Sequence, residues 1–248
     1  MSVWKKLLES VEEKGSAYLV LVDPDSVNNG PLSEAAKSIT KGGADGILIG
    51  GSLINNTDFD SSVAELKSST ELPVIIFPGS SRQISGRADL LLYLSLLSGR
   101  NADKIIGEQV RSAMKIKELK LETVSTAYLL IESGGITSAQ FMSGTTPIPR
   151  EKEDISVAHS VAAELMGMKA IYLEAGSGAK MPVPLKTVTA VCSEVNLPVI
   201  VGGGIHSPEA AELRARAGAS FIVTGTVHEG KMDEKLIGEF SRAVHWKE

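Results

Sequence analysis

The segment Ala170-Ile-Tyr-Leu-Glu-Ala-Gly-Ser-Gly178 joins an apolar run to a single carboxylate and then to a turn of small residues. Four apolar residues in a row are typical of a short strand that is buried on both faces. The glycines at 176 and 178 lack a Cβ, so the N–H groups of the turn can approach an anion. Glu174 lies where this strand would end, and parallel α/β barrels place functional side chains at such ends.

Two more apolar runs further along the chain end in glycine-rich turns. One leads into Gly203 and Gly204, and the other into Gly225 and Thr226. In α/β barrels, the loops after the seventh and eighth strands commonly hold a phosphate. A helix that begins after Ser207 would add the positive end of its dipole. We therefore expect one phosphate pocket at these turns, the alternative being that the glycines only permit tight turns.

Apolar runs alternate with amphipathic segments along the whole chain of 248 residues. The expected strands cover residues 17–22, 46–49, 73–77, 88–97, 124–131, 170–173, 199–202 and 221–223. The expected helices cover residues 1–14, 32–41, 59–69, 102–119, 151–167, 184–195, 208–217 and 233–244. This alternation predicts the α/β class and a (β/α)8 TIM barrel that forms a single domain over residues 1–248.

The connection between the third and fourth expected strands breaks the pattern. Residues 80–87 contain two arginines, a glycine and serines but no amphipathic run. We therefore predict that the third barrel helix is missing or vestigial, which leaves one flank of the barrel open beside these two strands. Residues 132–149, after the fifth strand, are predicted to form a long loop, and loops of this length are usually functional or mobile.

Composition excludes several functional classes. The net charge is −5, with 25 basic and 30 acidic residues and no basic block, which argues against nucleic-acid binding. Cys192 is the only cysteine, so neither a disulfide framework nor a thiolate metal cluster is expected. The strongest apolar run, residues 90–97, is far shorter than the ~20 residues that span a bilayer, and no targeting segment is visible. We expect a soluble, cytoplasmic protein.

Polar side chains at several strand ends are candidates for chemistry. Asp23 and Asp25 follow the first strand and Ser52 ends the second. Mg²⁺ is held by one or two carboxylates together with substrate phosphates, although turn capping also explains an aspartate here. Glu174, beside a phosphate turn, is suited to gripping a hydroxyl or to acting as a general base. Tyr172 points to the same side of the strand, as a ligand contact or as a core residue.

The four histidines show no spacing typical of metal ligands. His206 and His228 follow the glycine turns and are expected to be peripheral to the site. No lysine lies at a strand end in the manner of a Schiff-base enzyme, which disfavours aldolase chemistry.

Taken in order, the motifs resemble those of the geranylgeranylglyceryl phosphate synthase family. The resemblance rests on Asp23-Pro-Asp25, Gly50-Gly-Ser52, Tyr172-Leu-Glu-Ala-Gly-Ser-Gly178, Gly202-Gly-Gly-Ile205 and Gly225-Thr226, with Phe77-Pro-Gly79, Tyr93-Leu-Ser-Leu-Leu97 and Gly144-Thr-Thr-Pro-Ile-Pro149 between them. It covers almost the whole chain. The long fifth loop and Tyr128-Leu-Leu-Ile-Glu132 are similar to the second group of the family, which is often oligomeric.

The resemblance implies a Mg²⁺-dependent prenyltransferase. Such an enzyme transfers the geranylgeranyl group of geranylgeranyl diphosphate to the C3 hydroxyl of sn-glycerol 1-phosphate, which forms the first ether bond of archaeal membrane lipids and releases diphosphate. By this likeness, Glu174 would be catalytic, and Asp23 and Ser52 would bind Mg²⁺. The residues that would hold glycerol 1-phosphate are Tyr172, Leu173, Glu174, Ala175, Gly176, Ser177, Gly178, Gly203, Gly204, Gly225 and Thr226.

Other implications of the resemblance stay open. Many relatives carry a lysine after Asp-Pro-Asp where this chain has Ser26, so Arg82 or Arg87 is the candidate for a basic contact to the diphosphate. The donor could be longer, as for a heptaprenylglyceryl phosphate synthase. A phosphosugar isomerase or lyase, or a non-catalytic phosphate-binding barrel, is the more distant alternative. We further expect a homo-oligomer, a dimer or hexamer, and a transient membrane contact that serves the lipid product.

Overall fold

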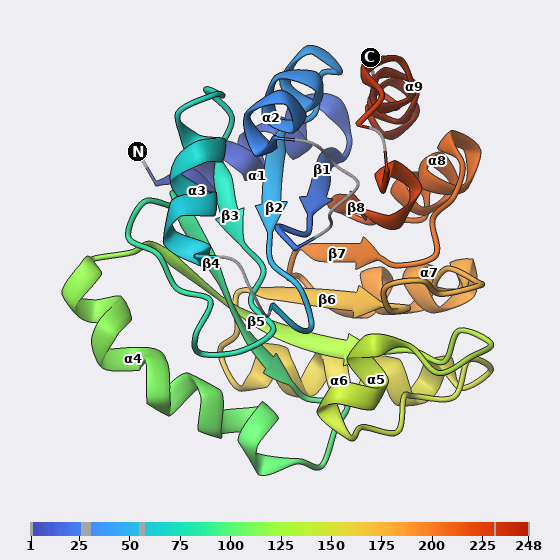
Figure 1. Ribbon diagram of the computed structural model, residues 1–248. Coiled ribbons are helices and arrows are strands. Elements are labelled where there is room, and N and C mark those ends of the chain that lie inside the picture. Colours follow the sequence, from blue (N-terminus) through green and yellow to red (C-terminus); the bar gives the residue numbers. More distant parts are fainter. Residues whose placement is uncertain (1, 26–30, 55–57, 231, 248) are drawn as a thin grey trace.

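The computed structural model describes residues 2–25, 31–54, 58–230 and 232–247. In these residues eight parallel strands follow one another around a closed barrel, and β1 pairs with β8 to complete the ring (Figure 1). The strands are β1 Ala17–Val22, β2 Gly46–Ile49, β3 Val74–Ile76, β4 Leu90–Leu96, β5 Thr123–Leu130, β6 Ala170–Glu174, β7 Val199–Gly202 and β8 Phe221–Thr224. The predicted TIM barrel is therefore confirmed.

Helices surround the barrel and connect successive strands (Figure 1). They are α1 Val3–Lys14, α2 Leu32–Lys41, α3 Phe59–Lys67, α4 Glu108–Leu119, α5 Ser138–Ser143, α6 Glu153–Leu165, α7 Leu185–Glu194, α8 Pro208–Arg216 and α9 Glu234–Val244. A π-helical turn, η1 Asp103–Gly107, leads into α4, and a 3₁₀ turn, η2 Thr226–His228, follows β8. Ser207 caps α8 as expected, since its side chain accepts a hydrogen bond from the N–H of Ala210.

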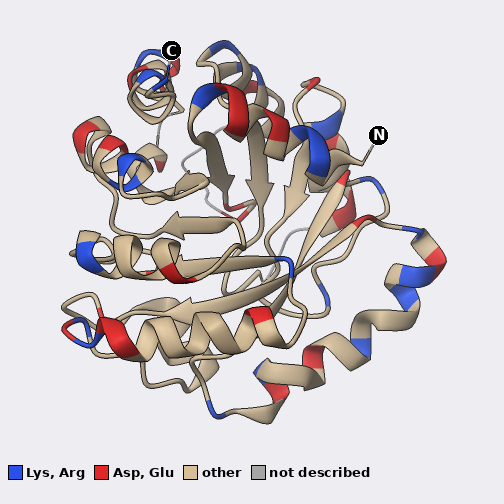
Figure 2. Ribbon diagram, turned by 180° about the vertical axis from the view of Figure 1, so that it is seen from behind, with Lys and Arg blue, Asp and Glu red and all other residues tan. Residues whose placement is uncertain are grey.

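The core has two layers, because each strand is covered on both faces. Side chains that point inward, such as Leu48, Leu92 and Ile200, fill the barrel interior, and α1 packs against this layer through Leu7. Side chains that point outward pack against the surrounding helices. Figure 2 shows charged residues of both signs on the outer helices and connecting loops, while the barrel strands are almost free of them. No helix among the described residues is long and apolar enough to cross a membrane.

The third barrel helix is missing, as predicted. Residues 77–89, all of which the structure describes, run from β3 to β4 without a helix. The helix after β4, α4, stands apart from the strands at one side of the molecule (Figure 1). It buries only Gln109, Ser112 and Ile116 of its twelve residues. Tyr93 connects the two elements, because its hydroxyl donates a 2.6 Å hydrogen bond to the carbonyl of Gln109.

The predicted loop 132–149 contains structure that the sequence did not indicate. Its middle forms the short helix α5, capped by Thr137, whose side chain accepts a hydrogen bond from the N–H of Gln140. Ile148 then pairs with Ile131 as an isolated parallel bridge, so the loop returns to the end of β5. The loop is therefore a folded flap over the strand ends and not an irregular connection.

Candidate active site

One cavity of about 840 Å³ lies at the carboxyl ends of the strands. It collects most of the predicted site residues: Asp23, Ser52, Tyr172, Glu174, Ser177, Gly203, Gly204, Gly225 and Thr226 all line it. Leu173 does not, because alternate residues of a strand point to opposite faces and this side chain lies in the outer core. Ala175, Gly176 and Gly178 belong to the same turn as Ser177 but are not among the lining residues.

Glu174 is the last residue of β6 and is only 5% exposed. Its Oε1 accepts a 2.6 Å hydrogen bond from the N–H of Gly176, and the carboxylate forms no ion pair with any described residue. Burial raises the pKa of this carboxyl from 4.5 to about 7, although the hydrogen bond from Gly176 acts in the opposite direction. A carboxyl with a pKa near neutrality can accept a proton from a ligand during a reaction.

Gly203 permits the close packing of the β7 turn against this carboxylate. β6 and β7 are paired so that Glu174 lies opposite Gly202, which brings the turn after β7 next to the carboxylate. The backbone of Gly203 has a φ of +80°, and a Cβ at this position would collide with Oε1 of Glu174. An alanine would therefore strain the backbone and displace the carboxylate of Glu174 and the turn after β6, whose backbone lies equally close.

The turns after β6 and β8 meet at the same end of the cavity. The hydroxyls of Ser177 and Thr226 lie 3.5 Å apart, so one small anion can contact both turns. Backbone N–H groups in turns of this kind are suited to phosphate. The geometry agrees with the expected phosphate pocket, although the role of each residue stays a prediction.

A buried polar network beneath the β8 turn was missed at the sequence level. The hydroxyl of Tyr18 lies 2.6 Å from Thr224 Oγ1 and 2.8 Å from Nε2 of His228, which is completely buried. His228 is therefore a buried residue beneath the site and does not line the cavity, whereas His206, also expected to be peripheral, does line it. Burial lowers the pKa of His228 to about 4, so the ring is neutral at pH 7. The network fixes the backbone that carries Gly225 and Thr226.

The Tyr172 side chain combines both roles considered for it. Its ring is buried in the barrel and stacks on Phe77, with ring centroids 5.0 Å apart. Tyr172 lines the cavity, and its hydroxyl interacts with the carboxylate of Glu174. Burial raises the pKa of Tyr172 well above its usual value, so the hydroxyl keeps its proton and can donate it to a ligand.

Asp23 and Ser52 line the same cavity and fit a cation. Asp23 is half-buried, it forms no ion pair with a described residue, and burial raises the pKa of its carboxyl. Its Oδ1 accepts a 2.9 Å hydrogen bond from the N–H of Asp25, which leaves Oδ2 beside Gly51. Among the described residues no three His, Cys, Asp or Glu gather as a complete metal site. One carboxylate and one hydroxyl suit Mg²⁺, which takes its other ligands from water and substrate phosphates.

The cavity continues from this polar end into an apolar groove. Leu91 and Tyr93 belong to the outer face of β4, whereas Leu94 faces the barrel interior, and all three line the cavity. The groove therefore passes over the outer face of β4, where the third helix of a regular barrel would lie. Phe141 and Met142 of α5 border the same cavity and are exposed.

Of the two candidate arginines, only Arg82 lies at the cavity. Arg87 pairs with Asp60, at 2.8 Å between Nε and Oδ2, and does not line the cavity. Ser26, the position of the expected departure from the family, lies outside the described residues.

Comparison with known proteins places the chain among similar sequences and structures. A family model described as the PcrB family matches residues 8–244. A geranylgeranylglyceryl phosphate synthase of Chitinophaga pinensis is 43% identical over 92% of this chain and 90% of its own length. A protein of the same name from Methanosphaera stadtmanae is 41% identical over 99% of this chain and 100% of its own length.

The similarity extends to a solved structure with a bound substrate. The crystal structure of (S)-3-O-geranylgeranylglyceryl phosphate synthase from Thermoplasma acidophilum, in complex with its substrate sn-glycerol-1-phosphate, matches with a TM-score of 0.92 at 33% identity and covers 99% of both chains. A wild-type enzyme of this kind from Thermoplasma volcanium matches with a TM-score of 0.89 at 35% identity, over 100% of this chain and 97% of that one.

Proposed function

The chain belongs to the PcrB family, and on this basis we propose that it is a prenyltransferase that joins the geranylgeranyl group of geranylgeranyl diphosphate to the C3 hydroxyl of sn-glycerol 1-phosphate. The observation that carries the proposal is the shape of the cavity at the strand ends. One end is built from phosphate-type turns around Glu174, and the other is an apolar groove along β4. A small polar acceptor and a long apolar donor fit these two ends.

The acceptor is held by the turns after β6, β7 and β8. Its phosphate lies against Ser177, Gly204 and Thr226, where backbone N–H groups and two hydroxyls are available. Its C3 hydroxyl donates a hydrogen bond to Glu174, whose carboxylate lines the cavity and forms no ion pair with a described residue. Two relatives with this name and the substrate complex of the Thermoplasma acidophilum protein support this assignment.

The transfer step forms one bond and breaks another. The C3 oxygen of glycerol 1-phosphate bonds to C1 of the prenyl chain, and the bond from C1 to the diphosphate oxygen breaks with its electron pair leaving on diphosphate. The proton of the attacking hydroxyl passes to Glu174, whose pKa of about 7 suits proton transfer near neutral pH. Asp23 and Ser52 would hold Mg²⁺, which would supply positive charge to the diphosphate.

The open flank accommodates the prenyl tail. Burial of an isoprenoid chain against apolar side chains gives roughly 25 cal/mol per Å² of surface removed from water. The groove supplies such side chains from two elements, β4 and the flap around α5. A barrel with a third helix packed on β4 would have no room at this place.

A product assay by mass spectrometry tests the proposal. The purified protein is incubated with sn-glycerol 1-phosphate and an equimolar set of C15 to C35 prenyl diphosphates, with Mg²⁺ or with a chelator. A Mg²⁺-dependent C20 ether is expected. A longer ether would keep the reaction and change the donor to that of a heptaprenylglyceryl phosphate synthase. No ether, with glycerol 1-phosphate still bound, would leave only a binding barrel. sn-Glycerol 3-phosphate is the matched control acceptor.

The expected homo-oligomer stays a prediction. Ile106, Val110 and Met114 are 57%, 67% and 75% exposed and follow one another at intervals of four residues. Residues with this spacing share one face of a helix, so they form an apolar stripe along η1 and α4. The stripe supports a contact with a second copy, and light scattering of the purified protein measures the number of subunits.

A further inference from the structure

We propose that Arg82 binds the diphosphate of the prenyl donor, at the border between the Mg²⁺ site and the apolar groove. The inference rests on the proposed prenyl transfer and assigns a binding residue to its leaving group, the diphosphate. It follows from the charges that line the cavity and from the hydrogen bonds that place the loop of Arg82.

The first observation concerns the lysine and arginine side chains of the cavity. Among its described lining residues these are Arg82 and Lys104. Lys104 forms an ion pair with Glu108, at 3.6 Å between Nζ and Oε1. Arg82 forms no ion pair with a described carboxylate, and its backbone N–H lies 3.4 Å from the hydroxyl of Ser80. Arg82 is exposed, so its guanidinium is accessible to a ligand at this end of the cavity.

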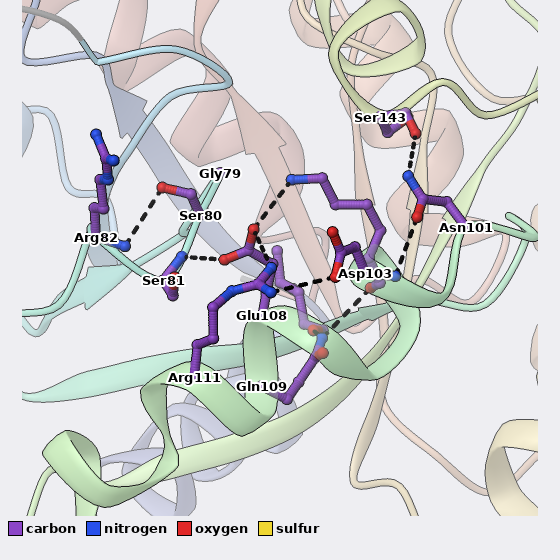
Figure 3. A network of polar contacts seen from close by, with 12 residues as sticks. Gly79, Ser80, Ser81, Arg82, Asn101, Asp103, Glu108, Gln109, Arg111 and Ser143 are labelled. Carbon is purple, nitrogen blue, oxygen red and sulfur yellow. Dashed lines mark hydrogen bonds and ion pairs between the residues drawn. The ribbon is translucent and has the colours of Figure 1, made fainter.

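The second observation is that Glu108 holds the loop of Arg82 in place (Figure 3). Oε2 of Glu108 accepts a 2.7 Å hydrogen bond from the N–H of Ser81, and Oε1 pairs with Arg111 at 3.1 Å. Burial raises the pKa of Glu108, but the contacts with Ser81, Arg111 and Lys104 outweigh it and bring it down to about 2. The carboxylate thus stays charged and occupied, and Figure 3 shows the Arg82 side chain extending away from it.

The third observation ties this loop to the Mg²⁺ end of the cavity. The buried side chain of Gln83 donates a 2.8 Å hydrogen bond to the carbonyl of Gly51, the residue before Ser52. Its Oε1 accepts a 3.0 Å hydrogen bond from the N–H of Gly79. The loop of Arg82 and the turn of Ser52 are therefore held side by side. A diphosphate that reaches the cation at Asp23 and Ser52 also borders this loop.

The leaving group gains negative charge that a guanidinium can stabilise. When the C1–oxygen bond breaks, its electron pair stays on the diphosphate, which gains negative charge. A guanidinium can donate two parallel N–H bonds to phosphate oxygens and does not lose its own proton. Arg82 therefore stabilises the diphosphate both on binding and as it departs, without taking part in the proton transfer at Glu174.

The test compares four substitutions on the full-length protein: R82A, R82K, R87A and K104A. R82A removes the proposed contact. R87A is the first control, because Arg87 lies on the same loop but pairs with Asp60 outside the cavity. K104A is the second control, because Lys104 lines the cavity but forms an ion pair with Glu108. Calorimetry with inorganic pyrophosphate and Mg²⁺ measures the anion site directly, and steady-state kinetics give the KM of each substrate.

R82A is expected to weaken pyrophosphate binding and to raise the KM of the prenyl donor by about 10- to 100-fold, the usual size of a lost charge-assisted contact. The KM of glycerol 1-phosphate should change less than about twofold. R87A and K104A should leave pyrophosphate binding nearly unchanged, and R82K should restore part of it as a point charge.

Two results would overturn the proposal. One is unchanged pyrophosphate binding in R82A, and the other is an equal rise of both KM values, which indicates structural damage. If the wild-type protein forms no ether product, the proposed function fails by itself. Pyrophosphate binding then still decides whether Arg82 belongs to an anion site.

Discussion

Replacement of Glu174 by glutamine separates the catalytic role of this residue from its cost to stability. Glutamine keeps the shape of the side chain and an oxygen for the hydrogen bond from Gly176. It cannot ionise and cannot accept the proton of the attacking hydroxyl. We expect E174Q to lower kcat by about 10²- to 10⁴-fold, the range for loss of a general base, and at the same time to stabilise the protein above neutral pH.

The size of the stabilisation follows from the pKa of the buried carboxyl. Folding raises it from 4.5 to about 7, a difference of about 2.5 pH units, which corresponds to about 3 kcal/mol at 1.36 kcal/mol per unit. Between these two values the folded protein binds more protons at this site than the unfolded chain does. Its free energy of unfolding therefore falls as the pH rises from 4.5 to 7 and is level above that. E174Q has no carboxyl at this position, so its free energy of unfolding does not fall in this way.

Urea unfolding of the wild type and E174Q between pH 4.5 and 8, followed by tryptophan fluorescence, measures the difference. The advantage of E174Q should grow by about 3 kcal/mol across this range. E132Q is the matched control, because Glu132 accepts the same 2.6 Å hydrogen bond from an N–H two residues further on but is less buried. Parallel stability curves for wild type and E174Q would refute the reasoning, and near-normal turnover by E174Q would remove its catalytic role.

Three further substitutions test other parts of the site and the fold. D23N should raise the Mg²⁺ concentration for half-maximal turnover at least about tenfold, because it removes the carboxylate proposed to hold the ion; an unchanged titration would contradict this. G203A should raise the KM of glycerol 1-phosphate at least about tenfold because its Cβ collides with Glu174, whereas G167A, at a φ of +77° with open space around it, controls for backbone strain. D45N should lower the free energy of unfolding by about 3 kcal/mol at pH 7, measured in urea, because this buried carboxylate accepts hydrogen bonds from a lysine, a histidine and a backbone amide. Although burial raises the pKa of Asp45, these contacts lower it below 3.8, so its contribution should persist down to that value and be lost only as the pH falls further.

The barrel could be predicted because each strand can be recognised from its own short stretch of sequence. Each strand is a short apolar run between polar turns, and β6, for example, differs from the prediction only by the inclusion of Glu174. The absence of the third helix could be predicted in the same way, because residues 80–87 carry no amphipathic run. The helix α5 was not predictable in this way. Its six residues have no amphipathic period, and it is fixed by the Thr137 cap and by the contact of Thr137 with Gly176.

Within the site, the location of a functional side chain was easier to predict than its burial and its contacts. Glu174, Asp23 and Ser52 were chosen because functional side chains lie at strand ends in these barrels, and all three line one cavity. The raised pKa of Glu174 depends on burial by residues from other strands, which no local pattern encodes. The role of His228 depends on Tyr18, which becomes its neighbour only when β1 pairs with β8 and closes the barrel.

The absence of one helix accounts for both halves of the proposed donor site. Without a helix on β4, the cavity extends over Leu91 and Tyr93 on the outer face of that strand. The same short connection lets Gln83 reach back to Gly51, so that the loop bearing Arg82 is fixed beside the proposed Mg²⁺ site. A helix inserted after β3 would cover the groove and move the arginine away from the cation. We infer that the apolar groove and the anion-binding loop arise from a single deviation from the regular barrel. An inserted helix that removes the groove should therefore also remove the anion-binding loop.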